Sequence, residues 1–258
     1  MPVLDIRVGQ QESCRFFTVV IRGSDMVTRI AAQERHFVDL SWMQAFWLFS
    51  YGEWYVPDNV RLGMLRAFND DLIQSREGFG MHLHEELEIV TIMLLGQLTI
   101  TDDAGECTTI HAGEVHRISA GTGTRHMEKN QESDPARYYQ IWIFPDKPGL
   151  MPSHEEKDFT QMSRQDRLLT VASGKGQPGA VTLHADASVS LSTFSPAFTL
   201  EYPITDDRCV LLYVTSGSIS LNGTLLEQGD QGRVTGETKE LSLASATGGS
   251  FVLVDVSA

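Results

Sequence analysis

The sequence of 258 residues predicts an all-β protein, an antiparallel sandwich or barrel, on two observations. The first is a series of short apolar or alternating runs rich in Val, Ile, Thr, Tyr and Phe, each bounded by Gly, Asp or Asn, which is typical of antiparallel strands joined by turns. The second is the scarcity of helical periodicity, which argues against alternating strand–helix units. The expected strands cover residues 14–21, 87–94, 97–101, 138–144, 189–194, 209–215, 218–221 and 250–256.

One segment favours a helix. In SHEEKDFTQM, residues 153–162, Ser153 stands at an N-cap position and Glu156 follows three residues later, which is the pattern of a capping box. The sequence therefore predicts one short helix here, within and just beyond the Pro-, Gly- and charge-rich stretch 144–158.

Two stretches of the chain resemble each other. Residues 95–115 read as strand, turn, strand and Gly-Glu, and residues 216–232 read as strand, Asn-Gly turn, strand and Gly-Asp. Asn-Gly between alternating residues is a strong signal for a β-hairpin. The repeat suggests two similar barrels joined through 144–158, with expected domains at 1–150 and 151–258, the second including the linker and the short helix.

Composition limits the classes of partner. Lys and Arg number 20 and Asp and Glu 34, so the formal charge of −14 argues against direct binding to nucleic acid. No apolar run approaches the roughly 20 residues that span a bilayer, and no secretory signal pattern opens the chain. The three cysteines, Cys14, Cys107 and Cys209, are far apart and form no CxxC pair. We therefore expect a cytoplasmic protein without a membrane or nucleic-acid partner.

The stretch GMHLHEELEIV, residues 80–90, carries the first candidate site. If the strand is continuous, His82, His84, Glu86 and Glu88 share one face, and that face continues into apolar residues at 90, 92 and 94. Such a face resembles the inside of a small barrel. Two neighbouring imidazoles at the mouth of an apolar cavity need partners, because buried polar groups are costly when unpaired.

A second pair, His126 and Glu128, lies in SAGTGTRHMEKN, residues 119–130, after a Gly-Thr-Gly turn that would return the strand beside the first. The two pairs offer three imidazoles and a carboxylate, a set that suits Fe(II) and also Mn, Co, Ni, Cu or Zn. Strand parity leaves Glu88 and Glu128 as equal candidates for the carboxylate. An isolated HxH is more often an ordinary strand feature than a ligand pair, so the combination carries the hypothesis.

The other histidines are weaker candidates. His116 is close enough in sequence to be a rival ligand, although its position favours a turn or the surface, as for His111. The remaining histidines lack companions, and we expect them to be structural or exposed: His36, His154 and His184.

The sequence closely resembles the pirin family of the cupin superfamily in four stretches, strongly over roughly residues 30–160 and weakly elsewhere. They are RHFVDLSWMQAFWLFSYGEWYVPDNVRLGMLRAFNDDLI, GFGMHLHEELEIVTIMLLGQLT, GEVHRISAGTGTRHMEKN and YYQIWIFPDKPGLMPSHEEKDF. The most specific motifs are SAGTG-x-RH-x-E-x-N and PD-x-x-GL-x-PS. The resemblance implies two cupin jelly-roll barrels with a single metal, usually iron, in the N-terminal barrel.

By this resemblance the metal ligands are His82, His84, His126 and Glu128, which favours Glu128 over Glu88. The C-terminal half has no HxH or HxE pair, so a metal is not expected there. The chain departs from the family at Glu85-Glu86, which replaces a basic–acidic pair, and at His116, where many relatives carry Gln. Either change could alter the preference for substrate or metal.

The resemblance further implies quercetin 2,3-dioxygenase activity, in which a flavonol reacts with O₂ and releases CO. Glu128 would serve as ligand and catalytic base, and Phe79 and Ile92 would line the pocket. Two alternatives stay open. One is an iron-dependent regulatory pirin that binds a protein partner, and the other is a cupin without a metal.

Overall fold

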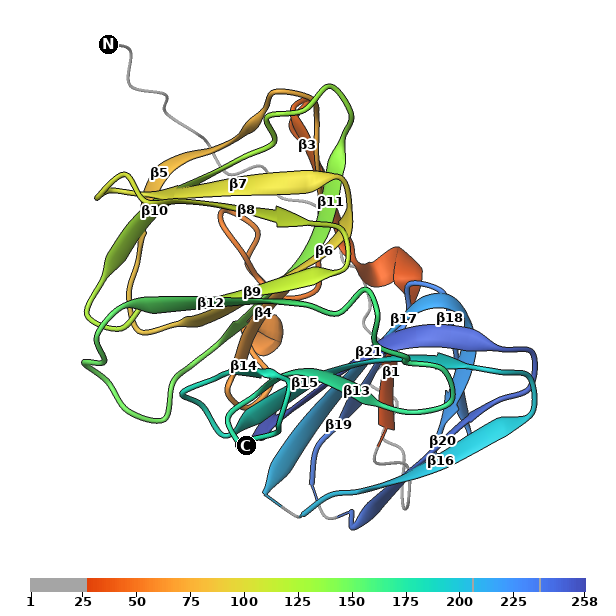
Figure 1. The fold of residues 1–258 in the computed structure, drawn as a ribbon. Helices are drawn as coiled ribbons and strands as arrows, with labels where there is room; N and C mark the ends of the chain where they lie inside the picture. The colour runs from red at the N-terminus through yellow and green to blue at the C-terminus, as the bar shows by residue number, and fades with distance from the viewer. Residues whose placement is uncertain (1–26, 206, 237) are drawn as a thin grey trace, which may run out of the picture.

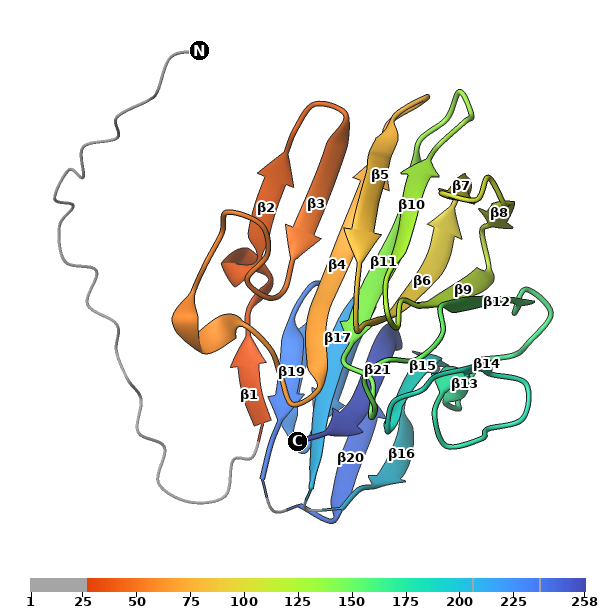
Figure 2. The same ribbon diagram turned by 90° about the vertical axis from the view of Figure 1, so that its left-hand side faces the viewer.

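The computed structural model describes residues 27–205, 207–236 and 238–258, and the regular secondary structure within them is almost entirely β-strand (Figures 1 and 2). The only helical turns among these residues are the 3-10 turns Ala32–Glu34 and Pro57–Asn59. The all-β prediction is therefore confirmed, whereas the strand expected at 14–21 lies outside the described residues. No helix in the described part of the chain is long and apolar enough to cross a membrane.

The N-terminal half is a sandwich of two sheets. The seven-stranded sheet has the order β12-β9-β6-β11-β4-β3-β2, and the four-stranded sheet has the order β5-β10-β7-β8. Met93 of the first sheet and Leu98 and Ile110 of the second are buried in one apolar cluster between them. The strands of the larger sheet are β2 (His36–Asp39), β3 (Met43–Trp47), β4 (Leu65–Ile73), β6 (Glu88–Leu95), β9 (Glu114–Ser119), β11 (Ala136–Ile143) and β12 (Ser153–Asp158). Those of the smaller are β5 (Gly78–His84), β7 (Gln97–Asp102), β8 (Cys107–His111) and β10 (Thr124–Lys129).

The C-terminal half is a ten-stranded sheet that folds over its own apolar cluster. The long strand β17 pairs with β19 and β21 along its first part and with β18 and β20 along its last part. The strands are β1 (Val27–Ile30), β13 (Leu169–Ser173), β14 (Val181–Thr182), β15 (Ala187–Phe194), β16 (Phe198–Pro203), β17 (Arg208–Leu221), β18 (Thr224–Glu227), β19 (Gln231–Val234), β20 (Glu240–Ser245) and β21 (Gly249–Ser257). All three sheets are open and pack as layers; none closes into a continuous barrel within the described residues, so the expectation of two closed barrels is wrong.

The predicted Asn-Gly hairpin is confirmed between β17 and β18. Leu221 pairs with Thr224, and Asn222 and Gly223 both adopt positive φ, 48° and 81°, as a tight two-residue hairpin turn requires.

The helix predicted at 153–162 is wrong. Residues Ser153–Asp158 form β12, which pairs along its whole length with β9 and makes the edge of the seven-stranded sheet. The Ser153 hydroxyl does not cap a helix; it accepts a hydrogen bond of 2.8 Å from the Arg117 guanidinium. Pairing with a distant strand therefore outweighs a local capping pattern, whose contribution is small.

The two halves share edge strands and one core. β1 precedes the N-terminal sheets in sequence but pairs with β19 of the C-terminal sheet, and β12 pairs with β9 of the N-terminal sheet. A continuous apolar cluster joins both halves, in which the Tyr213 ring of β17 contacts the rings of Phe68 and Tyr139. Ile92 belongs to this shared core, so the expectation that it lines the pocket beside the histidines is wrong.

Candidate metal centre

Strands β5 and β10 bring the His82/His84 pair and the His126/Glu128 pair together. They are antiparallel neighbours in the four-stranded sheet, with His82 directly opposite His126. The turn before β10 contains Gly121 and Gly123 at φ values of 47° and 130°, a conformation that side chains with a Cβ rarely adopt. The prediction that this glycine turn returns the second pair beside the first is confirmed.

Three imidazoles converge at this point. One ring nitrogen each from His82, His84 and His126 lie within 4.8 Å of one another. His84 and His126 are buried, and both ring nitrogens of His126 are enclosed without a hydrogen-bond partner. Burial, followed by the neighbouring His82 and His126, lowers the pKa of His84 to about 4, so its ring is neutral at pH 7. Converging imidazoles, with both nitrogens of His126 unpartnered, form a donor set that suits a divalent transition metal.

A backbone contact fixes the tautomer of one of these rings. The His82 Nδ1 atom lies 2.7 Å from the Gly80 carbonyl oxygen, which can only accept a hydrogen bond. Nδ1 therefore carries the proton, and the lone pair of His82 is on Nε2. Metal-binding histidines commonly donate their second ring N–H in this way, which orients the ring.

Glu128 lies beside the imidazoles and is held in place. Its Oε1 atom is 3.5 Å from His126 Nε2 and accepts a hydrogen bond of 2.8 Å from the Gln140 side-chain amide. The Tyr138 hydroxyl donates to Oε2 at 3.3 Å. Burial acts to raise the pKa of Glu128, but contact with His126 and the three histidines together lower it below its usual range. The residue is therefore a carboxylate at neutral pH.

Glu88 is separated from the histidines, so the expectation that His82, His84, Glu86 and Glu88 share one face is wrong. β5 ends at His84, the chain turns at Glu86 with a φ of 50°, and Glu88 begins β6 in the other sheet. The buried Glu88 carboxylate accepts hydrogen bonds from the Ser119 hydroxyl at 2.9 Å and from the His184 backbone N–H at 3.1 Å. The alternation of polar and apolar residues in the sequence continues through this turn, so the sequence pattern does not reveal where the strand ends.

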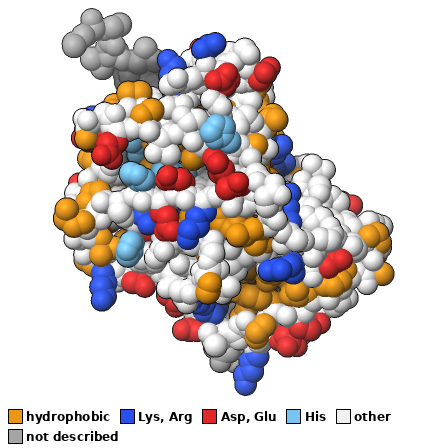
Figure 3. All heavy atoms as spheres, viewed as in Figure 1, with side chains coloured by type: hydrophobic (Ala, Val, Ile, Leu, Met, Phe, Trp, Pro, Cys, Tyr) orange, Lys and Arg blue, Asp and Glu red, His pale blue; other side chains and the backbone are white. Residues whose placement is uncertain are grey.

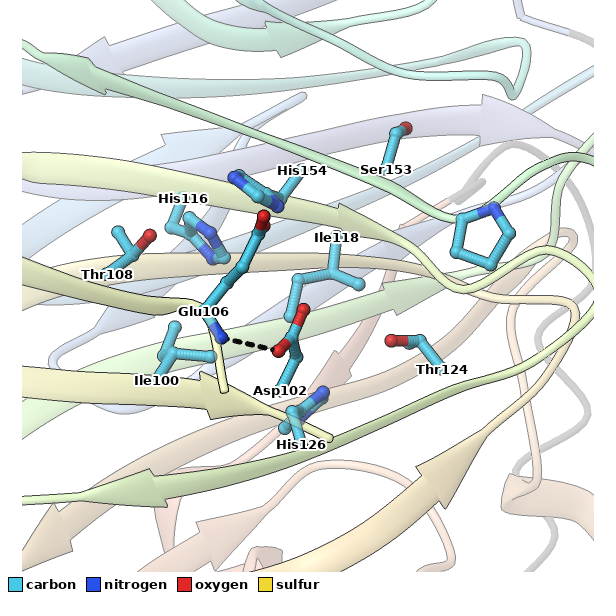
Figure 4. Close-up of a pocket in the computed structure, with 11 residues that line it drawn as sticks. Ile100, Asp102, Glu106, Thr108, His116, Ile118, Thr124, His126, Ser153 and His154 are labelled. Carbon is cyan, nitrogen blue, oxygen red and sulfur yellow. Dashed lines mark hydrogen bonds between the residues drawn. The ribbon is translucent and has the colours of Figure 1, made fainter. Parts of the chain in front are cut away.

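A cavity of about 400 Å³ adjoins the cluster between the two N-terminal sheets (Figure 4). His126 lines it from β10, and His116 and Ile118 line it from β9. His116 is buried, so its assignment to a turn or the surface is wrong, while burial and the nearby His154 lower its pKa to about 4. The sequence feature that could have identified His116 is its place in EVHRIS, a run that alternates as a strand does. The structure buries every residue of this run from Val115 to Ser119.

Aromatic side chains also contact two of the clustered histidines, His82 and His84. Trp142 lies edge-on to His84 at 4.9 Å between ring centroids, and Phe79 is 6.1 Å from His82. Phe79 is therefore near the site as expected, but it is not among the residues that line this cavity. Figure 3 shows histidine and acidic side chains near one another on one face of the molecule.

The other histidines lie apart from this cluster. His36 stacks on Trp54, and the exposed His111 contacts Glu114. His184 contacts Ser119 and Glu88 between the two halves, and the exposed His154 stacks on His116 at the cavity.

Comparisons with known proteins match both halves of the chain. The profile of the family described as Pirin matches residues 29–143, and that of the quercetinase C-terminal cupin domain matches residues 170–256. A pirin-like protein of Caulobacter vibrioides is 34% identical over 84% of this chain and 94% of its own length. The chain belongs to the pirin family. The His82/His84 and His126/Glu128 pairs of this pirin both fall within the first matched region.

Other relatives of this pirin have names that specify an activity or a ligand. A protein of Zymomonas mobilis, provisionally named a quercetin 2,3-dioxygenase, is 34% identical over 89% of this chain and 97% of its own length. The quercetin 2,3-dioxygenase of Escherichia coli K12 is 29% identical over 87% and 96%. The solved structure of the bacterial pirin YhhW from Escherichia coli in complex with nickel(II) is 28% identical, covers 90% of this chain and 99% of its own, and has a TM-score of 0.84.

Proposed function

We propose that this pirin binds one divalent transition metal through His82, His84, His126 and Glu128 and acts as a metal-dependent dioxygenase on flavonols such as quercetin. The observation that carries the proposal is the convergence of three imidazoles, with the unpartnered nitrogens of His126, beside the ionised Glu128. Fe(II) is the metal we expect first, and Mn, Co, Ni, Cu or Zn could also occupy this set of imidazole and carboxylate ligands. The nickel complex of the related Escherichia coli pirin supports a divalent ion.

We further infer that the chain consists of two cupin units, residues 1–150 with the metal and residues 151–258 without one. The match of residues 170–256 to a cupin domain supports the second unit. Among the described residues, the clustered histidines belong to the first half.

The residues around the site suit the chemistry of flavonol cleavage. When bound, the metal supplies a Lewis acid that stabilises the ionised 3-hydroxyl of the flavonol and an open position for O₂. Glu128 is ionised and is oriented by Gln140 and Tyr138, so it can hold the proton that the hydroxyl releases. The cavity beside His126 has a volume in the range of small-molecule sites and lies between two packed sheets, so it can hold an aromatic substrate next to the histidines.

The decisive experiment measures O₂ consumption and CO release from quercetin by the Fe(II)-loaded protein, together with its metal content. We expect His82→Ala to lose both the metal and the turnover. The matched control is His111→Ala, an exposed histidine on the same sheet, which should retain both.

Each alternative outcome identifies another function. Turnover that persists in His82→Ala would contradict the proposed ligands. Metal binding without turnover of any flavonol would favour the protein-binding regulator, and failure of the wild-type protein to take up any transition metal would favour the metal-free cupin.

A further inference from the structure

The cavity beside the histidine cluster has two different walls. His126 lies on the wall formed by the four-stranded sheet, and His116 lies on the wall formed by the seven-stranded sheet. Ile118 and Asp102 are between them in the close-up (Figure 4). A ligand that reaches the metal past His126 therefore has a second polar contact available at His116.

His116 is buried, yet the protein leaves it unpaired. Its Nδ1 atom is enclosed without a partner, and no hydrogen bond within the described residues involves Nε2, which is not among the enclosed atoms. The ring of His154 stacks on it, at 5.9 Å between centroids. A buried polar group without a partner is costly, and burial also keeps the ring neutral. A neutral imidazole has one donor and one acceptor, which suits a hydroxyl group.

The charges around the cavity exclude one class of ligand. Asp102 and Glu106 line it, whereas no Lys or Arg is among its lining residues. Two carboxylates on this part of the wall repel a ligand group that carries a carboxylate or phosphate. The apolar side chains of Ile100 and Ile118 provide contact area for an aromatic ring.

We propose that His116 determines substrate specificity by forming a hydrogen bond to a hydroxyl on the pendant phenyl ring of the flavonol, across the cavity from His126. The preferred substrates are then aromatic compounds that carry a hydroxyl on this ring in addition to the hydroxyl that binds the metal, and that carry no carboxylate or phosphate. The inference rests on the proposed function for the position of the metal-bound end.

The test compares two flavonols that differ only on the phenyl ring: quercetin, which has two hydroxyls there, and galangin, which has none. Their affinities are measured by calorimetric titration under anaerobic conditions, with metal-free and Fe(II)-loaded protein. We expect the wild type to prefer quercetin by about tenfold, the usual effect of one hydrogen bond to a buried partner. His116→Phe keeps an aromatic ring but should reduce the preference to less than about twofold, and His116→Gln should retain most of it.

Two controls separate recognition from damage. His111→Phe introduces the same side chain at an exposed histidine and should keep the wild-type preference. Metal content and thermal unfolding of His116→Phe should match the wild type, since His116 is not among the clustered histidines.

The inference is overturned if the wild type binds both flavonols equally, if it binds neither, or if His116→Phe keeps the preference. Its failure is distinct from that of the proposed function, which depends on turnover. If the protein turns over flavonols but its preference for quercetin does not depend on His116, the dioxygenase proposal stands and the inference about His116 is wrong. If the preference depends on His116 but no O₂ is consumed, the inference stands and the dioxygenase proposal is wrong.

Discussion

At the scale of single residues, the Glu128 carboxylate is positioned by a short chain of hydrogen bonds. Trp142 Nε1 donates to Gln140 Oε1 at 3.0 Å, which fixes the Gln140 amide so that its nitrogen donates to Glu128. Gln140→Leu should therefore weaken metal binding by about 10- to 100-fold, the usual effect of losing a group that orients a ligand. The measurement is the metal dissociation constant, obtained by competition with a chelator.

Gln97→Leu is the matched control for this change. The Gln97 amide donates to the Glu132 carboxylate on the surface, away from the histidines, so its replacement should leave metal affinity unchanged. Equal affinities in Gln140→Leu and the wild type would contradict a ligand role for Glu128 that depends on its orientation.

Residue spacing predicted part of this site and missed another part. His82, His84 and His126 could be found because residues two apart on a strand share a face, and a glycine turn leads into the strand that carries His126. Strand parity failed at Glu88, because the turn at Glu86 contains no glycine or asparagine and moves the chain into the other sheet. His116 was missed because its burial depends on cover from β12, a segment predicted as a helix.

At the scale of elements, the turn between β9 and β10 holds the two histidine strands in register. A Cβ at Gly121 would lie 2.0 Å from the Leu150 carbonyl oxygen, and the Gly121 carbonyl accepts the Glu86 backbone N–H at 2.9 Å. Gly121→Ala should therefore lower the free energy of unfolding by more than about 2 kcal/mol, because both the backbone conformation and the close contact are affected. Chemical denaturation measures this loss.

Gly105→Ala separates the two causes. Gly105 also has a positive φ, 86°, but a Cβ there would meet nothing within 4 Å. Its substitution should cost only the conformational strain of about 1–2 kcal/mol. If both variants lose equal stability, the contact with Leu150 does not constrain the turn.

At the scale of the whole molecule, the repeat in the sequence indicated two similar halves but not how they join. Pairing of β1 with β19 and of β12 with β9 links residues about 200 and 40 positions apart, and no local pattern encodes such partners. The apolar runs do not indicate how the halves join either. The sequence predicts that Ile92 is a buried strand residue, but it does not predict that Ile92 packs in the core shared by both halves. The consequence of a shared core is cooperativity: neither half can unfold without exposing apolar surface of the other.

Calorimetry of the metal-free protein should therefore give a single unfolding transition. Phe68→Ala removes a fully buried ring that contacts Tyr139 and Tyr213 across the two halves, and it should destabilise the protein by about 3–5 kcal/mol. Phe251→Ala removes a ring of the same size from the cluster of the C-terminal half alone. If the halves unfold together, both variants lower one transition by similar amounts, and the calorimetric and van't Hoff enthalpies agree. Two transitions, of which Phe251→Ala moves only one, would mean that the shared core does not couple the halves.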